Sequence, residues 1–312
     1  MKISDLGEGG FIRRIRQRFG PKTAHWPVGI GDDAAVIDLP SGYSLVCCSD
    51  LLVENTHFIR DLHPADSIAY KAVASNVSDV AAMGGTAMHF LISLAVPVDL
   101  DWSWFETFFE GLENACRQFN VALAGGDSAS SEHIFVDVSM NGLVRQGQAV
   151  RRSGAKVGDG IYVTGTLGSS ALGLERLKAG KTGDAAVKRH LFPEPRQTVG
   201  SALVSKAHAM IDVSDGLSVD LYHILEESKV SARIYKDRLP IWPGAEEHHA
   251  FHGGEEYELI IVAPDLPASV EGISLTRIGE IIESGMEHQA SVIDGTTESV
   301  LLPRGWQHFQ KG

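Results

Sequence analysis

Aspartate recurs along this chain at the edges of apolar segments, beside glycine and serine. The first such place is Gly29-Ile-Gly-Asp-Asp-Ala-Ala-Val36. The others are Cys48-Ser49-Asp50, Asn76-Val-Ser-Asp79, Gly125-Gly-Asp-Ser128 and Asp212-Val-Ser-Asp-Gly216. One pair such as Asp32 and Asp33 is commonly only a solvated turn, because Asp and Gly suit turns for backbone reasons. Its repetition at five places predicts that the fold gathers these carboxylates into one site.

Length and composition narrow the class of protein. A chain of 312 residues exceeds an average domain and predicts two domains that share a crevice. Its 44% hydrophobic and 21% charged residues are ordinary for a soluble globular protein. A net charge of −13 without a long basic run argues against nucleic-acid or anionic-membrane partners.

Nothing in the sequence predicts secretion or a membrane span. The amino terminus lacks a signal pattern, and no apolar run approaches the roughly 20 residues that cross a bilayer. The three cysteines, Cys47, Cys48 and Cys116, have neither zinc-ligand spacing nor the pattern of a disulfide framework. We therefore expect a cytoplasmic protein.

Strand and helix periodicities alternate in both halves of the chain. Strands are predicted at 34–39, 43–49, 87–96, 121–124, 134–144, 160–164, 210–213, 232–235, 258–263 and 275–282, and helices at 11–19, 64–83, 102–119, 169–178, 196–209 and 217–227. The polar stretch 145–159 places a domain boundary near Gly147, which gives domains 1–147 and 148–312. The predicted class is α+β, with two α/β domains and the site in the crevice between them.

Two further patterns bear on function. The strand at 134–144 alternates apolar and polar residues, so one of its faces is expected to lack a cover within the chain and to meet a partner. Gly180-Lys-Thr182 is similar to the end of a phosphate-binding loop, but Glu175 stands where such a loop needs its first glycine. We predict that this tripeptide only stops a helix.

The carboxylates favour a magnesium site over a zinc or copper site. The recurring ligands are oxygen atoms, without paired His or Cys, and this is the donor set of Mg²⁺. Carboxylates about 4 Å apart repel by ~4 kcal/mol at an effective dielectric near 20, so a cluster needs bound cations. Because Mg²⁺ shares oxygen ligands with phosphates, metal plus nucleotide is the combination that we expect.

Motifs along nearly the whole chain resemble the thiamine-monophosphate kinase family. They are Gly29-Ile-Gly-Asp-Asp-Ala-Ala, Ser49-Asp50 followed by Val53-Glu-Asn-Thr-His-Phe58, Asn76-Val-Ser-Asp-Val-Ala-Ala-Met-Gly84, Gly125-Gly-Asp127, Arg152-Ser-Gly-Ala-Lys156, Asp212-Val-Ser-Asp-Gly-Leu217, Gly253-Gly-Glu255, Tyr257-Glu-Leu259 and Gly305-Trp-Gln-His-Phe309. The family belongs to the superfamily of aminoimidazole ribonucleotide synthetase and selenophosphate synthetase. The resemblance implies a homodimer, joined through a β-barrel that the amino-terminal halves build across the dimer. It also implies ATP-dependent phosphorylation of thiamine monophosphate to thiamine diphosphate, by direct transfer assisted by Mg²⁺.

The same resemblance implies roles for individual residues. Several Mg²⁺ ions would be held by Asp33, Cys48, Ser49, Asp50, Asp79, Asp127, Asp212 and Asp215, and catalysis would act through the metal at Asp33, Asp50, Asp79, Asp127 and Asp212. ATP would be bound by Gly126, Asp127, Arg152 and Ser214, and thiamine monophosphate by His57, Glu255 and Trp306. Cys48 replaces a hydroxyl residue common in the family, so a ligand there comes from its side chain, the backbone or water.

Two alternatives stay open at this point. Another superfamily enzyme, such as a selenophosphate synthetase or a hydrogenase-maturation dehydratase, would need a reactive cysteine near one terminus, and the only early cysteines are Cys47 and Cys48. A protein that binds nucleotide and Mg²⁺ without turnover would share the same motifs, because a site does not prove catalysis. Taken alone, Trp306 is also open to a structural interpretation, as a clamp that packs the chain end.

Overall fold

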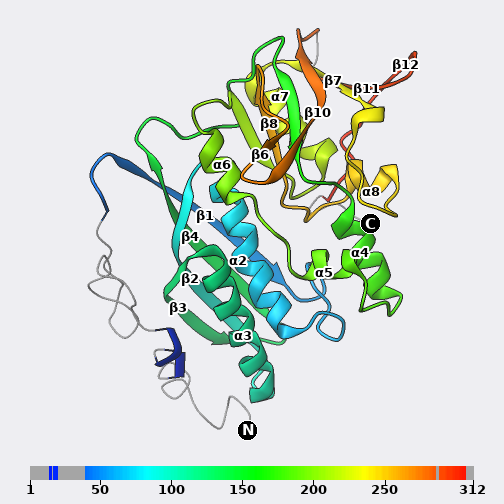
Figure 1. The fold of residues 1–312 in the computed structure, drawn as a ribbon. Coiled ribbons are helices and arrows are strands. Elements are labelled where there is room, and N and C mark those ends of the chain that lie inside the picture. The colour runs from blue at the N-terminus through cyan, green and yellow to red at the C-terminus, as the bar shows by residue number, and fades with distance from the viewer. Residues whose placement is uncertain (1–13, 16, 20–38, 286–287, 307–312) are drawn as a thin grey trace. The chain divides into compact units, whose positions relative to one another are not determined.

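The computed structural model describes residues 14–15, 17–19, 39–285 and 288–306. The chain divides into two compact units, Met1–Val80 with Thr86–Gly147, and Ala81–Gly85 with Gln148–Gly312 (Figure 1). The motif with Asp32 and Asp33, most of the strand predicted at 34–39 and most of the helix predicted at 11–19 lie outside the described residues.

The first unit contains a four-stranded sheet and two long helices (Figure 1). The strands are β1 (Tyr43–Val53), β2 (Thr86–Val96), β3 (Ala122–Ser130) and β4 (Phe135–Arg145), and the helices are α2 (Ala65–Ala82) and α3 (Trp102–Phe119). The strand order is β1-β4-β2-β3, in which only the β2–β3 pair is parallel. Over the described residues this sheet is open, with β1 and β3 as its outer strands.

Alternation along β1 and β4 gives the sheet two unlike faces. Every second residue of β4 is buried, among them Val136, Val138 and Met140, which confirms the half-covered strand predicted there. The opposite face leaves large apolar side chains in solvent. Tyr43 is 38% exposed, Leu45 43%, Leu51 47% and Leu91 42%. The sequence pattern therefore yields a sheet with one covered and one open face.

The strand β3 is longer than the strand predicted at 121–124. β3 continues through Gly125, Gly126 and Asp127 to Ser130, paired with β2. Glycine is required at 126 because a Cβ there would lie 1.8 Å from the carbonyl oxygen of Ile92. Gly126, the second residue of the glycine pair that ends the apolar run, thus allows β3 to approach β2 closely.

The second unit is built on one larger sheet. Its strands are β5 (Gly160–Thr164), β6 (Ala209–Asp212), β7 (Ser231–Tyr235), β8 (Leu259–Ala263), β9 (Ser269–Val270), β10 (Ile273–Ile282), β11 (Ala290–Asp294) and β12 (Thr297–Val300). The sheet order is β12-β11-β7-β10-β5-β8-β6, with β9 paired to β10. Strands β5 and β8 are buried along their whole length, as expected of central strands covered on both faces.

Helices of the second unit follow the predicted order with three differences. They are α4 (Ser169–Lys178), α5 (Ala185–Leu191), α6 (Gln197–Leu203), α7 (Leu217–Ser228) and α8 (Glu247–His252), with a 3₁₀ turn at Lys236–Arg238. The helix predicted at 196–209 is wrong at its end, because the chain enters β6 at Ala209. The short α5 and α8 were not predicted. Gly180 follows α4 with a φ of 75°, which confirms the helix stop.

The junction between β6 and α7 places the acidic motif of this unit. The buried strand β6 ends at Asp212, and α7 begins at Leu217, so Ser214, Asp215 and Gly216 form the turn between them. Gly216 has a φ of 121°, a conformation that favours glycine. Among the described helices, none combines the length and apolarity needed to cross a membrane.

Candidate active site

A buried carboxylate organises the turn after β6. Asp220, in the first turn of α7, is 2% exposed, and its Oδ2 accepts three successive backbone N–H groups. The donors are Ser214 at 3.1 Å, Asp215 at 3.1 Å and Gly216 at 3.0 Å. Sequence reasoning missed Asp220. The available signal was an acidic residue in the first turn of a helix, where the N–H groups lack partners within the helix.

Three carboxylates crowd around this turn. Burial raises the pKa of Asp220 well above its ordinary range, and the charges of Asp212 and Asp215 raise it further. Asp212 is itself only 4% exposed. The three groups are therefore close enough to repel one another, and a divalent cation would remove that repulsion. An all-oxygen donor set of this charge fits Mg²⁺.

Two segments distant in the sequence meet the same turn. The N–H of Glu255 donates to the carbonyl oxygen of Ser214 at 2.7 Å, and the N–H of Trp306 donates to that of Asp215 at 3.1 Å. Glycines precede both donors, and a Cβ on Gly305 would lie 2.2 Å from the Asp215 carbonyl oxygen. The structure thus brings together four residues that the sequence predicts for the site from three separate motifs.

The side chain of Trp306 is not buried as a terminal clamp would be. It is 47% exposed, while its backbone is fixed to the turn by the bond to Asp215. An indole held in this way is accessible to a ligand. The observation favours the binding interpretation over the clamp.

The three glutamates of the 255–258 segment have different environments. Glu258 is 1% exposed and lies between two arginines, with contacts of 2.7 Å to Arg189 and 2.5 Å to Arg196. Glu255 has a side chain 26% exposed, a φ of 59°, and an oxygen 3.5 Å from Nδ1 of the buried His190. Of the three, only Glu255 is accessible to a substrate.

Glu256 caps a helix from inside the core. Its carboxylate accepts Ser169 Oγ at 2.7 Å and the N–H of Ser170 at 2.8 Å, at the first residues of α4. Burial raises the pKa of Glu256 to about 7, although both hydrogen bonds oppose the rise. Glu256 therefore has a structural role, and its carboxyl group changes protonation near neutral pH.

In the first unit, β1 places two predicted site residues against α2. Cys48 Sγ lies 3.5 Å from both the carbonyl oxygen and Oδ1 of Asn76, which is fully buried. Burial raises the pKa of Asp50, while a hydrogen bond from Ser75 and the charge of His57 lower it. Asp79 is half-buried one turn beyond Ser75 on the same helix. Asp50 and Asp79 therefore belong to adjacent elements.

Ser49 and Asp127 do not join that group. The Ser49 side chain is on the open face of β1, where Oγ donates to Asp137 Oδ1 at 2.9 Å. Asp127 is exposed on β3 beside Ser93, also on the open face. Because β1 and β3 are the outer strands, Asp50 and Asp127 are about three strand spacings, or ~14 Å, apart. Within one chain these two carboxylates cannot bind the same ion.

His57 lies in a loop held by ionic and backbone contacts. Its Nδ1 accepts the N–H of Val53 at 3.0 Å, so in the neutral ring Nε2 carries the proton. Arg60 makes two contacts of 2.7 Å to the buried Glu54, which also accepts the N–H of Ile134 at 2.9 Å. The loop is thus fixed near Asp50, whose pKa the charge of His57 lowers.

Three predicted site residues remain: Asp33, Gly126 and Arg152. Asp33 lies outside the described part of the chain. Arg152 and Gly126 are exposed, Arg152 in the loop that leads to β5. The residue-level roles in metal and ligand binding stay predictions.

Two other features in the described residues are separate from this site. Glu175, His248 and His249 have ligand atoms within 4.8 Å of one another. However, His249 Nδ1 accepts the N–H of Glu246 at 2.9 Å, which directs the Nε2 proton of the neutral ring towards Glu175. A metal at Nε2 would move the ring proton to Nδ1, which could then no longer accept the N–H of Glu246, so the helix cap would be lost.

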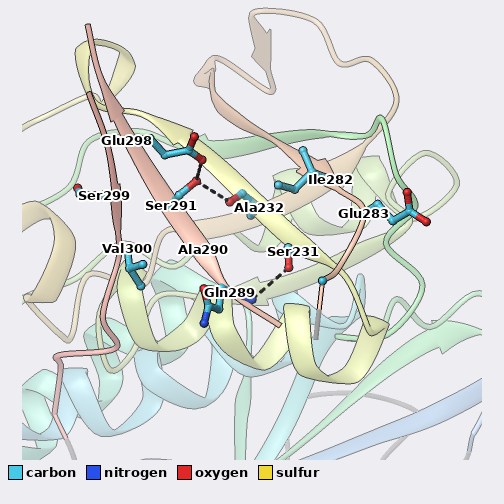
Figure 2. A pocket seen from close by; sticks show the side chains of 11 residues that line it. Ser231, Ala232, Ile282, Glu283, Gln289, Ala290, Ser291, Glu298, Ser299 and Val300 are labelled. Atoms are coloured by element: carbon cyan, nitrogen blue, oxygen red, sulfur yellow. Dashed lines mark hydrogen bonds between the residues drawn. The ribbon is translucent and has the colours of Figure 1, made fainter. Parts of the chain in front are cut away.

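A hollow of about 620 Å³ lies at the outer strands of the second sheet (Figure 2). Its lining comes from β7, β10, β11, β12 and their connections, and includes Ser231, Gln289, Ser291 and Glu298. Ser291 Oγ donates to Glu298 at 2.6 Å within it. None of the predicted site residues lines this hollow.

Comparison with known proteins decides the family. The family models "AIR synthase related protein, N-terminal domain" and "AIR synthase related protein, C-terminal domain" match residues 31–144 and 156–289. The thiamine-monophosphate kinase of Escherichia coli (strain K12) is 39% identical over 97% of this chain and 98% of its own length. That of Haemophilus influenzae is 36% identical over 98% and 99%. This chain belongs to the thiamine-monophosphate kinase family.

Solved structures agree with membership of the thiamine-monophosphate kinase family. The structure described as AaThiL complexed with AMPPCP and TMP is 33% identical, with a TM-score of 0.78 over 99% of both chains. A hydrogenase maturation protein HypE in complex with ATP also reaches a TM-score of 0.78, at 19% identity. The HypE likeness shows a shared fold alone. The alternative of a hydrogenase-maturation enzyme therefore has the fold in its favour and lacks the sequence similarity.

The pKa of Glu256 predicts a pH dependence of stability. A carboxyl group with a raised pKa in the folded state stabilises the fold fully below its unfolded value of 4.5, and that contribution is lost as the pH rises through about 7. We expect Glu256→Gln to remove this loss, which amounts to roughly 3 kcal/mol at most. Urea unfolding at pH 5 and pH 8 measures it. Glu110→Gln, an exposed carboxylate on α3, is the matched control.

Wild type should therefore lose more stability than Glu256→Gln between these two pH values. Parallel losses in wild type, Glu256→Gln and Glu110→Gln would show that Glu256 does not titrate in this range.

Proposed function

We propose that this protein transfers the γ-phosphoryl group of ATP to thiamine monophosphate, giving thiamine diphosphate and ADP. The observation that carries the proposal is the convergence of Glu255 and Trp306 on the acidic turn of Ser214 and Asp215. Relatives with full-length similarity are thiamine-monophosphate kinases, and one neighbour is described in complex with AMPPCP and TMP. The carboxylates of the turn suit a nucleotide bound through Mg²⁺, and Glu255 and Trp306 suit the cationic acceptor.

The reaction needs positioning more than acid–base chemistry. An oxygen of the acceptor phosphate forms a bond to the γ-phosphorus, the bond from that phosphorus to the bridging oxygen breaks, and ADP leaves with the electron pair. Both reactants are anions, and the attacking oxygen carries no proton that must be removed. Bound Mg²⁺ would supply neutralisation of the phosphate charges.

Residues of this chain would divide the remaining work. In the second unit, Asp212 and Asp215 would provide oxygen donors for Mg²⁺. In the first unit, Asp50 and Asp79 would do so. Arg152 and Ser214 would hold ATP. Because ATP is the phosphoryl donor, a cytoplasmic location goes with this proposal.

The acceptor site would use the indole of Trp306 and the carboxylate of Glu255. Thiamine carries a cationic thiazolium and a flat pyrimidine, which an aromatic face attracts by stacking and cation–π contact worth about 0.5–2 kcal/mol. The accessible carboxylate of Glu255 would attract the same thiazolium cation by its negative charge. ATP offers no such cation, so these residues should discriminate between the two substrates.

A homodimer through the first unit is part of the proposal. The open sheet face carries Tyr43, Leu45, Leu51 and Leu91, each more than one-third exposed, and the resemblance implies a β-barrel built by two copies. Several large apolar side chains exposed on one face of a sheet favour a partner. Sedimentation at micromolar concentration should give the mass of two chains, and a monomeric mass would refute the dimer.

Substrate kinetics test the function and the acceptor site together. Wild type with ATP, Mg²⁺ and thiamine monophosphate should form thiamine diphosphate, and excess chelator should abolish the product. Trp306→Ala should raise the KM for thiamine monophosphate about 3- to 30-fold and leave the KM for ATP within about twofold, because only the acceptor is a cation. The KM of Trp306→Phe for thiamine monophosphate should lie between those of wild type and Trp306→Ala.

Absence of thiamine diphosphate with active ATP binding would favour a protein that binds nucleotide without turnover. Equal weakening of both substrates by Trp306→Ala, together with a lower melting temperature, would make Trp306 a structural clamp.

A further inference from the structure

Helix α7 contacts a predicted site loop at each of its ends. In its first turn, Asp220 holds the N–H groups of Ser214, Asp215 and Gly216. At its last residue, Ser228 holds the loop that begins at Arg152. A helix of 12 residues is about 18 Å long, so one rigid element connects two loops that are far apart in sequence.

The Ser228 hydroxyl uses its full hydrogen-bonding capacity on the arginine loop. Oγ donates to the carbonyl oxygen of Arg152 at 3.0 Å, and it accepts the N–H groups of Gly154 at 3.1 Å and Ala155 at 3.2 Å. A hydroxyl has one donor and two acceptor positions, and all three are directed at this loop. A single atom therefore specifies the path of the backbone after Arg152.

Other contacts hold the base of the loop, and among the described residues Ser228 makes the hydrogen bonds to its tip. The N–H of Met210 donates to the carbonyl oxygen of Arg151 at 3.0 Å, which joins the loop to β6. Gly154 has a φ of 122°, and a Cβ there would lie 2.5 Å from the carbonyl oxygen of His208. The Arg152 side chain is exposed. Its direction thus depends on the backbone rather than on packing of the side chain.

We propose that Ser228 is a positioning residue for Arg152, through which α7 couples the ATP-binding loop to the acidic turn. The inference rests on the proposed function, because it needs Arg152 to contact ATP. Without the hydroxyl, the N–H of the exposed Gly154 can bond to water, and only the N–H of the buried Ala155 loses its partner. Loss of the hydroxyl would therefore loosen the loop without unfolding the unit.

Steady-state kinetics of Ser228→Ala test this role. We expect the KM for ATP to rise about 5- to 20-fold, while the KM for thiamine monophosphate stays within about twofold. Ser228→Thr keeps the hydroxyl and should restore the KM for ATP to within about threefold of wild type. Ser201→Ala is the matched control, because Ser201 Oγ bonds only to Thr198 within α6, at 3.1 Å, among the contacts described.

A double-mutant cycle separates positioning from general stability. Arg152→Ala alone should weaken ATP, and adding Ser228→Ala should then change the KM for ATP by less than about twofold, because the group that Ser228 positions is gone. Multiplicative effects of the two changes, or equal rises in both KM values for Ser228→Ala, would overturn the proposal.

Calorimetric binding of a non-hydrolysable ATP analogue gives a readout that does not need turnover. The analogue should bind Ser228→Ala about 5- to 20-fold more weakly than wild type. Unchanged affinity would refute the positioning role. If wild type binds the analogue but forms no thiamine diphosphate, the proposed function fails, and the binding ratio still decides the role of Ser228.

Discussion

The second unit depends on one buried carboxylate that satisfies three backbone N–H groups. Asp220 fixes the turn of Ser214, Asp215 and Gly216 in a single conformation. Each buried N–H left without a partner would cost about 1–3 kcal/mol, so this arrangement outweighs many surface contacts. Burial raises the pKa of this carboxyl group, and the neighbouring charges of Asp212 and Asp215 raise it further. The same turn is therefore ordered by hydrogen bonds and crowded with negative charge, and a bound cation would relieve the repulsion.

Two further site residues of the second unit are attached to that turn by backbone hydrogen bonds. Glu255 and Trp306 donate their N–H groups to its carbonyl oxygens, and this leaves both side chains accessible. Neighbouring acidic residues have other tasks, since Glu256 caps α4 and Glu258 is held between arginines. Acidic residues that look equivalent in the sequence are thus separated by burial into a ligand candidate and two structural groups.

Much of the fold and part of the candidate site could be predicted from the sequence. Helices α3 and α4 and the buried strand β5 follow from apolar periodicity, because packing on a covered face imposes the period. Short elements such as α8, and the exposed edge strand β12, lack such a period. The sequence motifs indicate Asp50 and Asp215, but not that Ser49 faces away from Asp50. The strand was predicted to end at Ser49, whereas β1 continues to Val53, and neighbouring residues on a strand point to opposite faces. Asp220 was missed because its task is to bind the backbone.

We infer that the carboxylates at the β6–α7 turn repel one another until a cation binds. Thermal unfolding of wild type and Asp212→Asn, each with and without Mg²⁺ and a non-hydrolysable ATP analogue, tests it most directly. Without divalent ions, Asp212→Asn should melt a few degrees above wild type, since about 1 kcal/mol corresponds to roughly 2–4 °C. With Mg²⁺ and the analogue, wild type should gain more than the variant. A variant that melts below wild type without ions and gains as much on binding would contradict the claim.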